Sequence, residues 1–493
     1  MSKQKYLTYL SAFFILAAFL RIYNIDQKNM WFDEVFSWHT SQNDIKQIVI
    51  ITSGDIHPPL FYIVLKYWTS SFGDSVIAMR MLSVILNLLT AVFLLKICTQ
   101  LRLDDRQKLF ALFLYAITPL NIYYSQEIRM QALSLFLTCG SVYYFIRAID
   151  KCSFRISIGY IIFTFLSFYT HYFTFLIFGA QILYAGYIYF RKEINSKLLF
   201  RLSANFFIPA ILFIPWINVL IDQVSKGQPW RKQQDFFQVF VEFLKYFNDF
   251  IFSTYHNFAA LWTEIIIYTF SILLIISVLY FIIKLFKVEH IKKNFHHKLL
   301  AFLIALPLIF AFLLSFRQSI IFSRYLSTLV PYLCILISIM IYRISSTKKR
   351  DAAIVLLSLM FISGLYNNSY NSWKYNDYRG IISYIKDNDS SSDYSLITDP
   401  HYLGWVIKYE SLHSDNSIKK SDVFGWDLPM QFDSLRKRSD IRNLWVVLDY
   451  SSMDKNGYDE LESDLGILGF KAVKEKYFYI YPEKVKAAYY VRK

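Results

Sequence analysis

The chain has 493 residues, of which 55% are apolar, 19% are aromatic and only 18% are charged. Soluble domains carry about a quarter charged residues, so the composition and the long apolar runs exclude an ordinary soluble protein for most of the length. The net charge of +15 would suit a nucleic-acid partner, but the placement of the basic residues along the chain indicates a membrane protein instead.

Eleven apolar segments come near the ~20 residues that a helix needs to cross a bilayer. They predict a polytopic α-helical membrane protein with spans at roughly 6–23, 75–98, 107–125, 130–148, 156–170, 172–190, 199–221, 258–286, 298–316, 322–342 and 352–369. No small-residue cleavage site precedes the polar stretch at Arg21, so the first segment is expected to be an uncleaved helix rather than a signal peptide.

Lys and Arg gather before the first span and in every second loop after it. The clearest examples are Lys3 and Lys5; Arg102, Arg106 and Lys108; Arg147, Lys151 and Arg155; Arg191, Lys192 and Lys197; Lys284, Lys287 and Lys292; and Arg343, Lys348 and Lys349. By the positive-inside rule the N-terminus is cytoplasmic, and an odd number of spans places the C-terminal tail on the exofacial, periplasmic side. This alternation explains the basic excess without nucleic acid and predicts a multi-pass protein of the plasma (inner) membrane.

Two long loops lie on the predicted exofacial side. Residues 24–74 include the amphipathic stretches Asp44–Thr52 and Leu60–Ser70, which are too short to cross and predict helices lying in the interface. Residues 222–257 are expected to form the second loop.

The composition turns polar near residue 373, so we expect a membrane domain at 1–372 and an exofacial domain at 373–493. Within the tail, Ser395–Thr398 and Leu444–Leu448 are typical of buried strands. Gly380–Lys386 and Asp459–Leu468 are typical of helices, and the alternation predicts a small α/β domain. The four cysteines form no CxxC pair, which argues against a disulfide framework or a thiol metal site.

Polar residues with candidate chemistry lie near the predicted exofacial ends of the spans. Asp33 and Glu34 follow the first span, and adjacent carboxylates there are costly unless they line a wet cavity. The other candidates are His57, Tyr124, Glu127, Arg129, His171, Arg324 and Tyr325. Each alone has an ordinary explanation, such as solvated carboxylates, a loop ion pair, or an Arg that reaches the interface. Together, acids, cations and imidazoles at one membrane face suit a reaction between a lipid-borne anion and a polar acceptor.

Six stretches, in this order, resemble the GT-C glycosyltransferases, and within them the family 39 and aminoarabinose-transferase-like group. They are WFDE at residue 31, HPPLFYIVLKYW, RMLSVILN from Arg80, YYSQEIRMQAL from Tyr123, YTHYF from Tyr169 and SRYLSTLVP from Ser323. The resemblance covers about residues 1–370. It implies a GT-C membrane domain and a mannosyltransferase-like enzyme that takes its sugar from a polyprenyl phosphate.

The resemblance also implies roles for single residues. The acid of the first loop, Asp33, is catalytic, with Glu34 beside it and Glu127 as a second acid. Arg129 and Arg324 hold the donor phosphate. His57 stands where some relatives carry Lys before the Pro-Pro pair, so a contact of His57 with phosphate depends on its protonation. Acceptor binding or structural support falls to Tyr124, His171 and Tyr325.

The chemistry of the residues agrees with these roles. An attacking acceptor hydroxyl must lose its proton, and a carboxylate such as Asp33 can take it, with Glu34 or Glu127 orienting the acceptor. Guanidinium groups bind a departing phosphate bidentately, and direct displacement inverts the anomeric centre. The predicted membrane domain, residues 1–372, contains no DxD motif of the kind that serves a nucleotide sugar. The sequence assigns no specific cofactor, and a divalent cation on Asp33 and Glu127 stays open. The sugar, a hexose or a pentose, and the acceptor, a protein, a lipid or a polysaccharide, stay open as well.

Two other classes compete with this interpretation. A transporter, or a flippase for a glycolipid, predicts charges at mid-span and paired repeats with broken helices. A membrane-anchored receptor would leave the acidic first loop without a role. Because the candidate ionisable residues lie at span ends, the transferase is favoured.

Overall fold

The computed structural model describes residues 1–27, 29–226, 233–253, 261–287, 296–371, 378–388, 393–399, 402–413, 420–423, 432–433, 435–438, 440–449, 455–480 and 483–492. The chain forms two compact units, and each is described here by itself. Unit 1 comprises Met1–Ile25, Asn43–Gly73 and Ala78–Ser369, and unit 2 comprises Asp26–Gln42, Asp74–Ile77 and Tyr370–Lys493. The boundary predicted at residue 373 lies outside the described residues.

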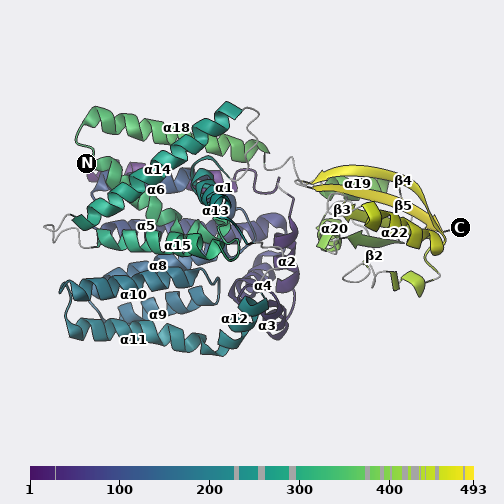
Figure 1. Cartoon of the computed structure of the whole chain (residues 1–493), viewed down its shortest axis with the longest axis horizontal. Coiled ribbons are helices and arrows are strands. Elements are labelled where there is room, and N and C mark those ends of the chain that lie inside the picture. Colours follow the sequence, from purple (N-terminus) through teal and green to yellow (C-terminus); the bar gives the residue numbers. More distant parts are fainter. Residues whose placement is uncertain are drawn as a thin grey trace. The chain divides into compact units, whose positions relative to one another are not determined.

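Unit 1 is built from helices, which run side by side in its larger part (Figure 1). They are α1 (Lys3–Ile22), α3 (Ile45–Gly54), α4 (Leu60–Phe72), α5 (Val76–Gln100), α6 (Asp105–Ile117), α7 (Pro119–Ser125), α8 (Gln131–Asp150), α9 (Phe154–Phe168), α10 (Thr174–Phe190), α11 (Ser196–Phe213), η1 (Ile214–Trp216), α12 (Ile217–Lys226), α13 (Phe236–Phe252), α14 (Leu261–Lys287), α15 (His297–Ser315), α16 (Ser323–Leu326), η3 (Ser327–Leu329), α17 (Val330–Tyr342) and α18 (Thr347–Asn371).

Within the described ranges, 7 helical runs are long and apolar enough to cross a membrane. Their outward faces are apolar too: on α14, for example, Leu273, Ile276 and Leu279 are more than half exposed. A surface of this kind is stable in lipid rather than in water, so the chain is a multi-pass membrane protein. Each of the eleven predicted spans falls on a helix or on a run of short helices, although the number that cross stays a prediction.

Three of these runs are interrupted, which the sequence interpretation had not indicated. The span predicted at 107–125 divides into α6 and α7 at Thr118, whose ψ is 116°. Pro119 follows Thr118, and a residue before proline avoids the helical conformation. Pro215 stands within η1, and η3 separates α16 from α17. Broken helices therefore do not by themselves separate a transporter from a transferase in this chain.

The expected loop at 222–257 is wrong for much of its length. The structure continues α12 to Lys226 and forms α13 over Phe236–Phe252. Asp235 and Gln238 make a capping box that begins α13, in which each side chain accepts a hydrogen bond from the backbone of the other residue. The stretches predicted at 44–52 and 60–70 are confirmed as helices α3 and α4, whereas their place in the membrane interface stays a prediction.

Unit 2 is a mixed sheet with helices (Figure 1). Its elements are α2 (Phe32–Ser41), α19 (Tyr378–Asn388), β1 (Asp393–Asp399), α20 (Tyr402–His413), β2 (Lys420–Val423), β3 (Asn443–Asp449), α22 (Lys455–Ile467), β4 (Phe470–Ile480) and β5 (Glu483–Arg492). The strand order is β2-β1-β3-β5-β4; β1 pairs in parallel with β2 and β3, and β5 pairs antiparallel with β3 and β4. The two strands and two helices predicted in the tail are confirmed as β1, β3, α19 and α22.

The central strand β3 is apolar on both of its faces. Val446 lies in a buried cluster with Leu461 and Leu465 of α22, whereas the neighbouring Trp445 meets Tyr384 of α19 edge to face, with ring centroids 5.7 Å apart. Helices thus cover both sides of the sheet, which is why Leu444–Leu448 is a continuous apolar run rather than an alternating one.

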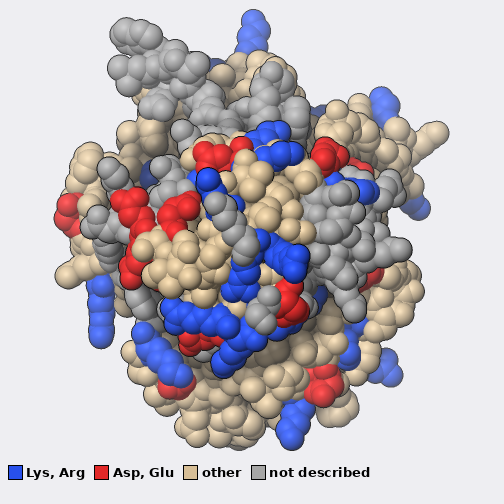
Figure 2. All heavy atoms as spheres, turned by 90° about the vertical axis from the view of Figure 1, so that its right-hand side faces the viewer, with Lys and Arg blue, Asp and Glu red and all other residues tan. Residues whose placement is uncertain are grey.

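Charges of both signs are interspersed on the face that Figure 2 shows. Exposed pairs in unit 2 include Arg438 with Asp440 at 2.9 Å and Arg436 with Asp433 at 3.4 Å. A nucleic-acid interface is typically a stripe of one sign, and this face has no such stripe among its described atoms.

Candidate active site

The two acids of the first loop stand at the start of α2, in unit 2. Residue Trp31 has extended backbone before the helix, and Asp33 and Glu34 occupy its first turn, where carboxylates favour the positive end of the helix dipole. Asp33 is half-buried, whereas Glu34 is 1% exposed. The hydroxyl of Ser37 donates to the backbone oxygen of Asp33 at 2.8 Å. Of the two carboxylates, Asp33 is therefore the one that solvent or a substrate reaches.

Glu127 and Arg129 share a buried turn between α7 and α8, in unit 1. Both side chains are less than 5% exposed. Ser83 of α5 donates its hydroxyl to the backbone oxygen of Glu127 at 2.6 Å. Gln126 donates to the backbone oxygens of Arg21 and Tyr23, both at 3.0 Å. The turn is thus tied to α5 and to the end of α1.

The end of α1 is itself fixed by a buried arginine. Arg21 is fully buried and donates to the side chain of Asn87 at 2.7 Å and to the backbone oxygens of Tyr115 and Ala116 at 3.1 Å. Asn87 in turn donates to Asn121 of α7 at 2.8 Å. A buried cation is tolerated when its donors are satisfied in this way. The sequence did not predict this network, although polar residues inside apolar spans are a signal for it.

His57 is held against the turn between α9 and α10. The backbone N–H of Leu60, just after the Pro-Pro pair, donates to the backbone oxygen of Tyr169 at 3.0 Å. The rings of His57 and His171 are stacked, with centroids 5.6 Å apart and planes 26° apart. The structure therefore brings together two imidazoles that are more than 100 residues apart in sequence.

His171 continues this contact to Tyr325. Its Nδ1 accepts the backbone N–H of Phe173 at 3.2 Å, so the neutral ring carries its proton on Nε2. The His171 and Tyr325 rings lie 5.4 Å apart. Phe173 stacks on Tyr325 at 4.8 Å with an interplanar angle of 13°. Tyr325 is buried, so its ring fixes the position of the imidazole.

Arg324 adds a positive charge beside the ring of Tyr325. Its guanidinium lies over the Phe322 ring at 5.4 Å and over the Tyr325 ring at 5.5 Å, and the residue is half-buried. Beside it, the hydroxyl of Ser323 donates to Asp249 of α13. Asp249 was missed because residues 222–257 were expected to be a loop. We call His57, His171, Tyr325 and Arg324 the imidazole–arginine chain.

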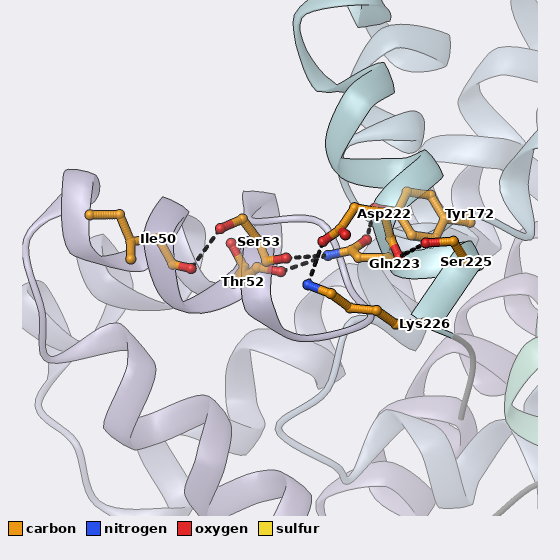
Figure 3. Close-up of polar contacts among 8 residues, drawn as sticks. All are labelled: Ile50, Thr52, Ser53, Tyr172, Asp222, Gln223, Ser225 and Lys226. Carbon is orange, nitrogen blue, oxygen red and sulfur yellow. Dashed lines mark hydrogen bonds and ion pairs between the residues drawn. The ribbon is translucent and has the colours of Figure 1, made fainter. Parts of the chain in front are cut away.

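A second group of polar contacts fixes both histidine-bearing segments (Figure 3). Gln223 of α12 donates to the backbone oxygen of Thr52 at 2.8 Å and of Ser53 at 3.3 Å, at the end of α3. Its carbonyl accepts from the hydroxyl of Tyr172, which accepts the indole N–H of Trp216 at 2.9 Å. We call this set the Gln223 clamp. It joins the chain just before His57 to the residue just after His171.

The remaining candidates are placed as follows. Tyr124 is half-buried, packs against the apolar core of unit 1 and meets Tyr123 edge to face at 5.1 Å. Among the described residues, no three His, Cys, Asp or Glu side chains lie together as a metal site. A cation shared by Asp33 and Glu127 stays a prediction, since these residues belong to different units.

An open cavity of about 800 Å³ lies elsewhere in unit 1, where Tyr9, Phe110 and Tyr342 line it together with Lys5 and Arg106. None of the predicted site residues lines it. Its size therefore says nothing about the candidate chemistry.

The comparisons with known proteins agree on one architecture. Residues 56–217 match the family described as dolichyl-phosphate-mannose-protein mannosyltransferase, whereas no curated protein matches the chain. ArnT from Cupriavidus metallidurans in the apo state is similar with a TM-score of 0.62 and 11% identity, over 98% of both chains. ArnT bound to undecaprenyl phosphate is similar with a TM-score of 0.56 and 10% identity, over 97% of this chain and 98% of that one. The apo oligosaccharyltransferase of Archaeoglobus fulgidus gives 0.57 and 12%, over 97% of this chain and 73% of that one.

Proposed function

This multi-pass membrane protein has the fold of the GT-C glycosyltransferases, as its sequence motifs predicted, and from that premise we propose that it moves a sugar from a polyprenyl phosphate to a hydroxyl acceptor. The observation that carries the proposal is the match to ArnT over nearly the whole of both chains. One of the ArnT structures holds undecaprenyl phosphate, which is a carrier of the proposed class.

In the proposed reaction, Asp33 is the general base. The acceptor oxygen gives its proton to the Asp33 carboxylate as it bonds to the anomeric carbon, and the bond from that carbon to the phosphate oxygen breaks. The carrier leaves as a phosphate anion, and a direct displacement of this kind inverts the anomeric centre. The half-buried position of Asp33 supports this role, while the buried Glu34 suits a residue that orients its neighbour.

The imidazole–arginine chain is proposed to bind the donor phosphate. Arg324 provides a permanent cation beside two aromatic rings, and guanidinium groups suit the oxygens of a phosphate. His171 carries its proton on Nε2 and can donate it to an anion. His57 contributes charge only when it is protonated. Arg129 is the second proposed guanidinium, with Glu127 as the second acid of the site.

The proposal includes an orientation. The basic loops favour a cytoplasmic N-terminus in the plasma membrane and a transfer reaction on the opposite, exofacial side. The competing assignment as a transporter or flippase has no such support, since the similar structures described above are those of ArnT and of an oligosaccharyltransferase.

The test compares three variants in cells that make this protein. Asp33→Asn should abolish the addition of sugar to surface glycans, measured by mass spectrometry, while purified protein remains folded and monodisperse. Asp26→Asn removes an exposed carboxylate of the same segment and should leave the addition intact. Arg324→Ala should weaken retention of undecaprenyl phosphate by the purified protein, which Asp33→Asn should not. Full transfer by Asp33→Asn would refute the assignment of the base.

A further inference from the structure

The helix that carries Asp33 packs on the C-terminal domain through aromatic side chains. Trp405 of α20 stacks on the His39 ring, with centroids 4.8 Å apart and planes 8° apart. The rings of Phe32 and Phe36 each lie 6.1 Å from Trp405, inclined by 26° and 28°. All of these residues belong to unit 2. One indole thus meets three successive turns of the acid-bearing helix.

A second contact lies one turn further along α20. Tyr409 meets Trp38 edge to face, with centroids 5.0 Å apart. The indole N–H of Trp38 donates to the Asp74 carboxylate at 3.0 Å, and the Tyr409 hydroxyl donates to the Asp74 backbone oxygen at 3.1 Å. Asp74 therefore bridges the two helices from the short segment that precedes α5.

The spacing of these residues sets the rotation of α2. Phe32, Phe36 and His39 are related by i, i+4 and i+7, so they form one stripe along the helix. Asp33 follows Phe32 by one residue and lies about 100° around the axis from that stripe. When the stripe rests on Trp405, the direction in which the Asp33 carboxylate points is fixed.

We propose that Trp405 and Tyr409 are positioning residues for Asp33, so that the C-terminal domain aims the acid of the first loop. The consequence for catalysis rests on the function proposed above, whereas the docking of α2 on α20 does not. The domain is then a working part of the active site rather than a separate receptor, and the aromatic side chain of Trp405 serves α2 rather than an acceptor sugar.

Hydrogen–deuterium exchange of the full chain in detergent tests the docking. In Trp405→Ala, amides of α2 should exchange about tenfold faster or more, while those of β3 keep their protection. Tyr477→Ala removes an exposed aromatic ring from β4 and is the matched control, which should leave α2 unchanged. Trp405→Phe keeps a ring and should recover part of the protection. Unchanged exchange of α2 in Trp405→Ala would overturn the proposal.

Variants of α2 keep the test decisive even if Trp405→Ala unfolds the C-terminal domain. If Trp405→Ala also exposes β3, then Phe36→Ala and His39→Ala are used, since they leave the domain core intact. These variants should loosen α2 alone. Continued protection of α2 in both would overturn the proposal.

A functional measurement separates positioning from general damage. Trp405→Ala should lower the addition of sugar about tenfold or more, while native mass spectrometry shows retention of undecaprenyl phosphate within about twofold of the parent. Equal loss of transfer and of lipid binding would contradict a positioning role. If Asp33→Asn transfers sugar normally, the proposed function fails, but the exchange result for α2 still decides whether the helices are docked.

Discussion

Replacement of Gln223 by leucine should loosen the polar contacts that join the segments of His57 and His171. The side chain is 6% exposed and makes three hydrogen bonds, two as a donor and one as an acceptor. Leucine has a similar volume and makes none of them. A buried neutral hydrogen bond contributes about 1 kcal/mol net, and a stranded partner costs about 1–3 kcal/mol. We therefore expect Gln223→Leu to lower the free energy of unfolding by about 2–4 kcal/mol.

The assay is denaturant unfolding of the purified protein in detergent, followed by tryptophan fluorescence. The adjacent Asp222→Asn is the matched control, because Asp222 and Lys226 form an exposed pair on the same helix. Exposed pairs contribute about 0–1 kcal/mol, so the control should move stability little. Gln223→Leu should also weaken retention of undecaprenyl phosphate, since both histidine-bearing segments lose a tether. Equal effects of Gln223→Leu and Asp222→Asn on stability would refute the reasoning.

Three further predictions follow from single contacts. Burial and, secondarily, the charge of Lys408 lower the pKa of His39. The neutral imidazole therefore stabilises the folded protein fully above the pKa of about 6.5 that His39 has in the unfolded chain, and this stabilisation is lost as pH falls through the lower pKa of the folded state. Exchange protection of α2 should therefore weaken on acidification, and His39→Phe should remove that dependence; equal pH dependence in both proteins would contradict it. A Cβ at Gly140 would lie 2.1 Å from the Phe163 ring, whereas Gly186 has open space, so Gly140→Ala should cost about 1–3 kcal/mol and Gly186→Ala should not. Arg21→Lys keeps the charge but loses the planar guanidinium, whose several N–H groups donate to different acceptors at once, so it should lower the melting temperature. An unchanged melting curve would disprove this.

Most of the helices could be predicted from the sequence because lipid-facing segments are long and rich in apolar residues. The ends of α5, α8 and α15 agree with the predicted spans to within about two residues. Prediction failed where one local residue, or a few charges, departed from the overall apolar pattern of a segment. The apolar run at 107–125 hides the break at Pro119. Helix α13 carries Glu242, Lys245 and Asp249 among its apolar residues, so it does not form a long uncharged run of the kind that predicts a span.

The candidate site was predicted in part for a similar reason. The topology predicted from the sequence places His57, His171 and Arg324 near one membrane face, and in the structure they are connected through ring contacts. The partners that hold them could not be predicted, because Gln223 and Tyr172 are ordinary residues whose contact links segments 51 positions apart. The packing of α2 on α20 spans more than 360 residues, and only the folded chain reveals it.

The partition of the chain has a practical consequence for engineering. The acid-bearing segment Asp26–Gln42 shares its compact unit with the C-terminal domain and is encoded hundreds of residues away from it. A chimera that exchanges the tail with that of a relative, but keeps its own first loop, would pair an aromatic stripe with a foreign surface. Exchange of both pieces together preserves the match, so domain shuffling in this architecture has to move two distant stretches of the gene as one.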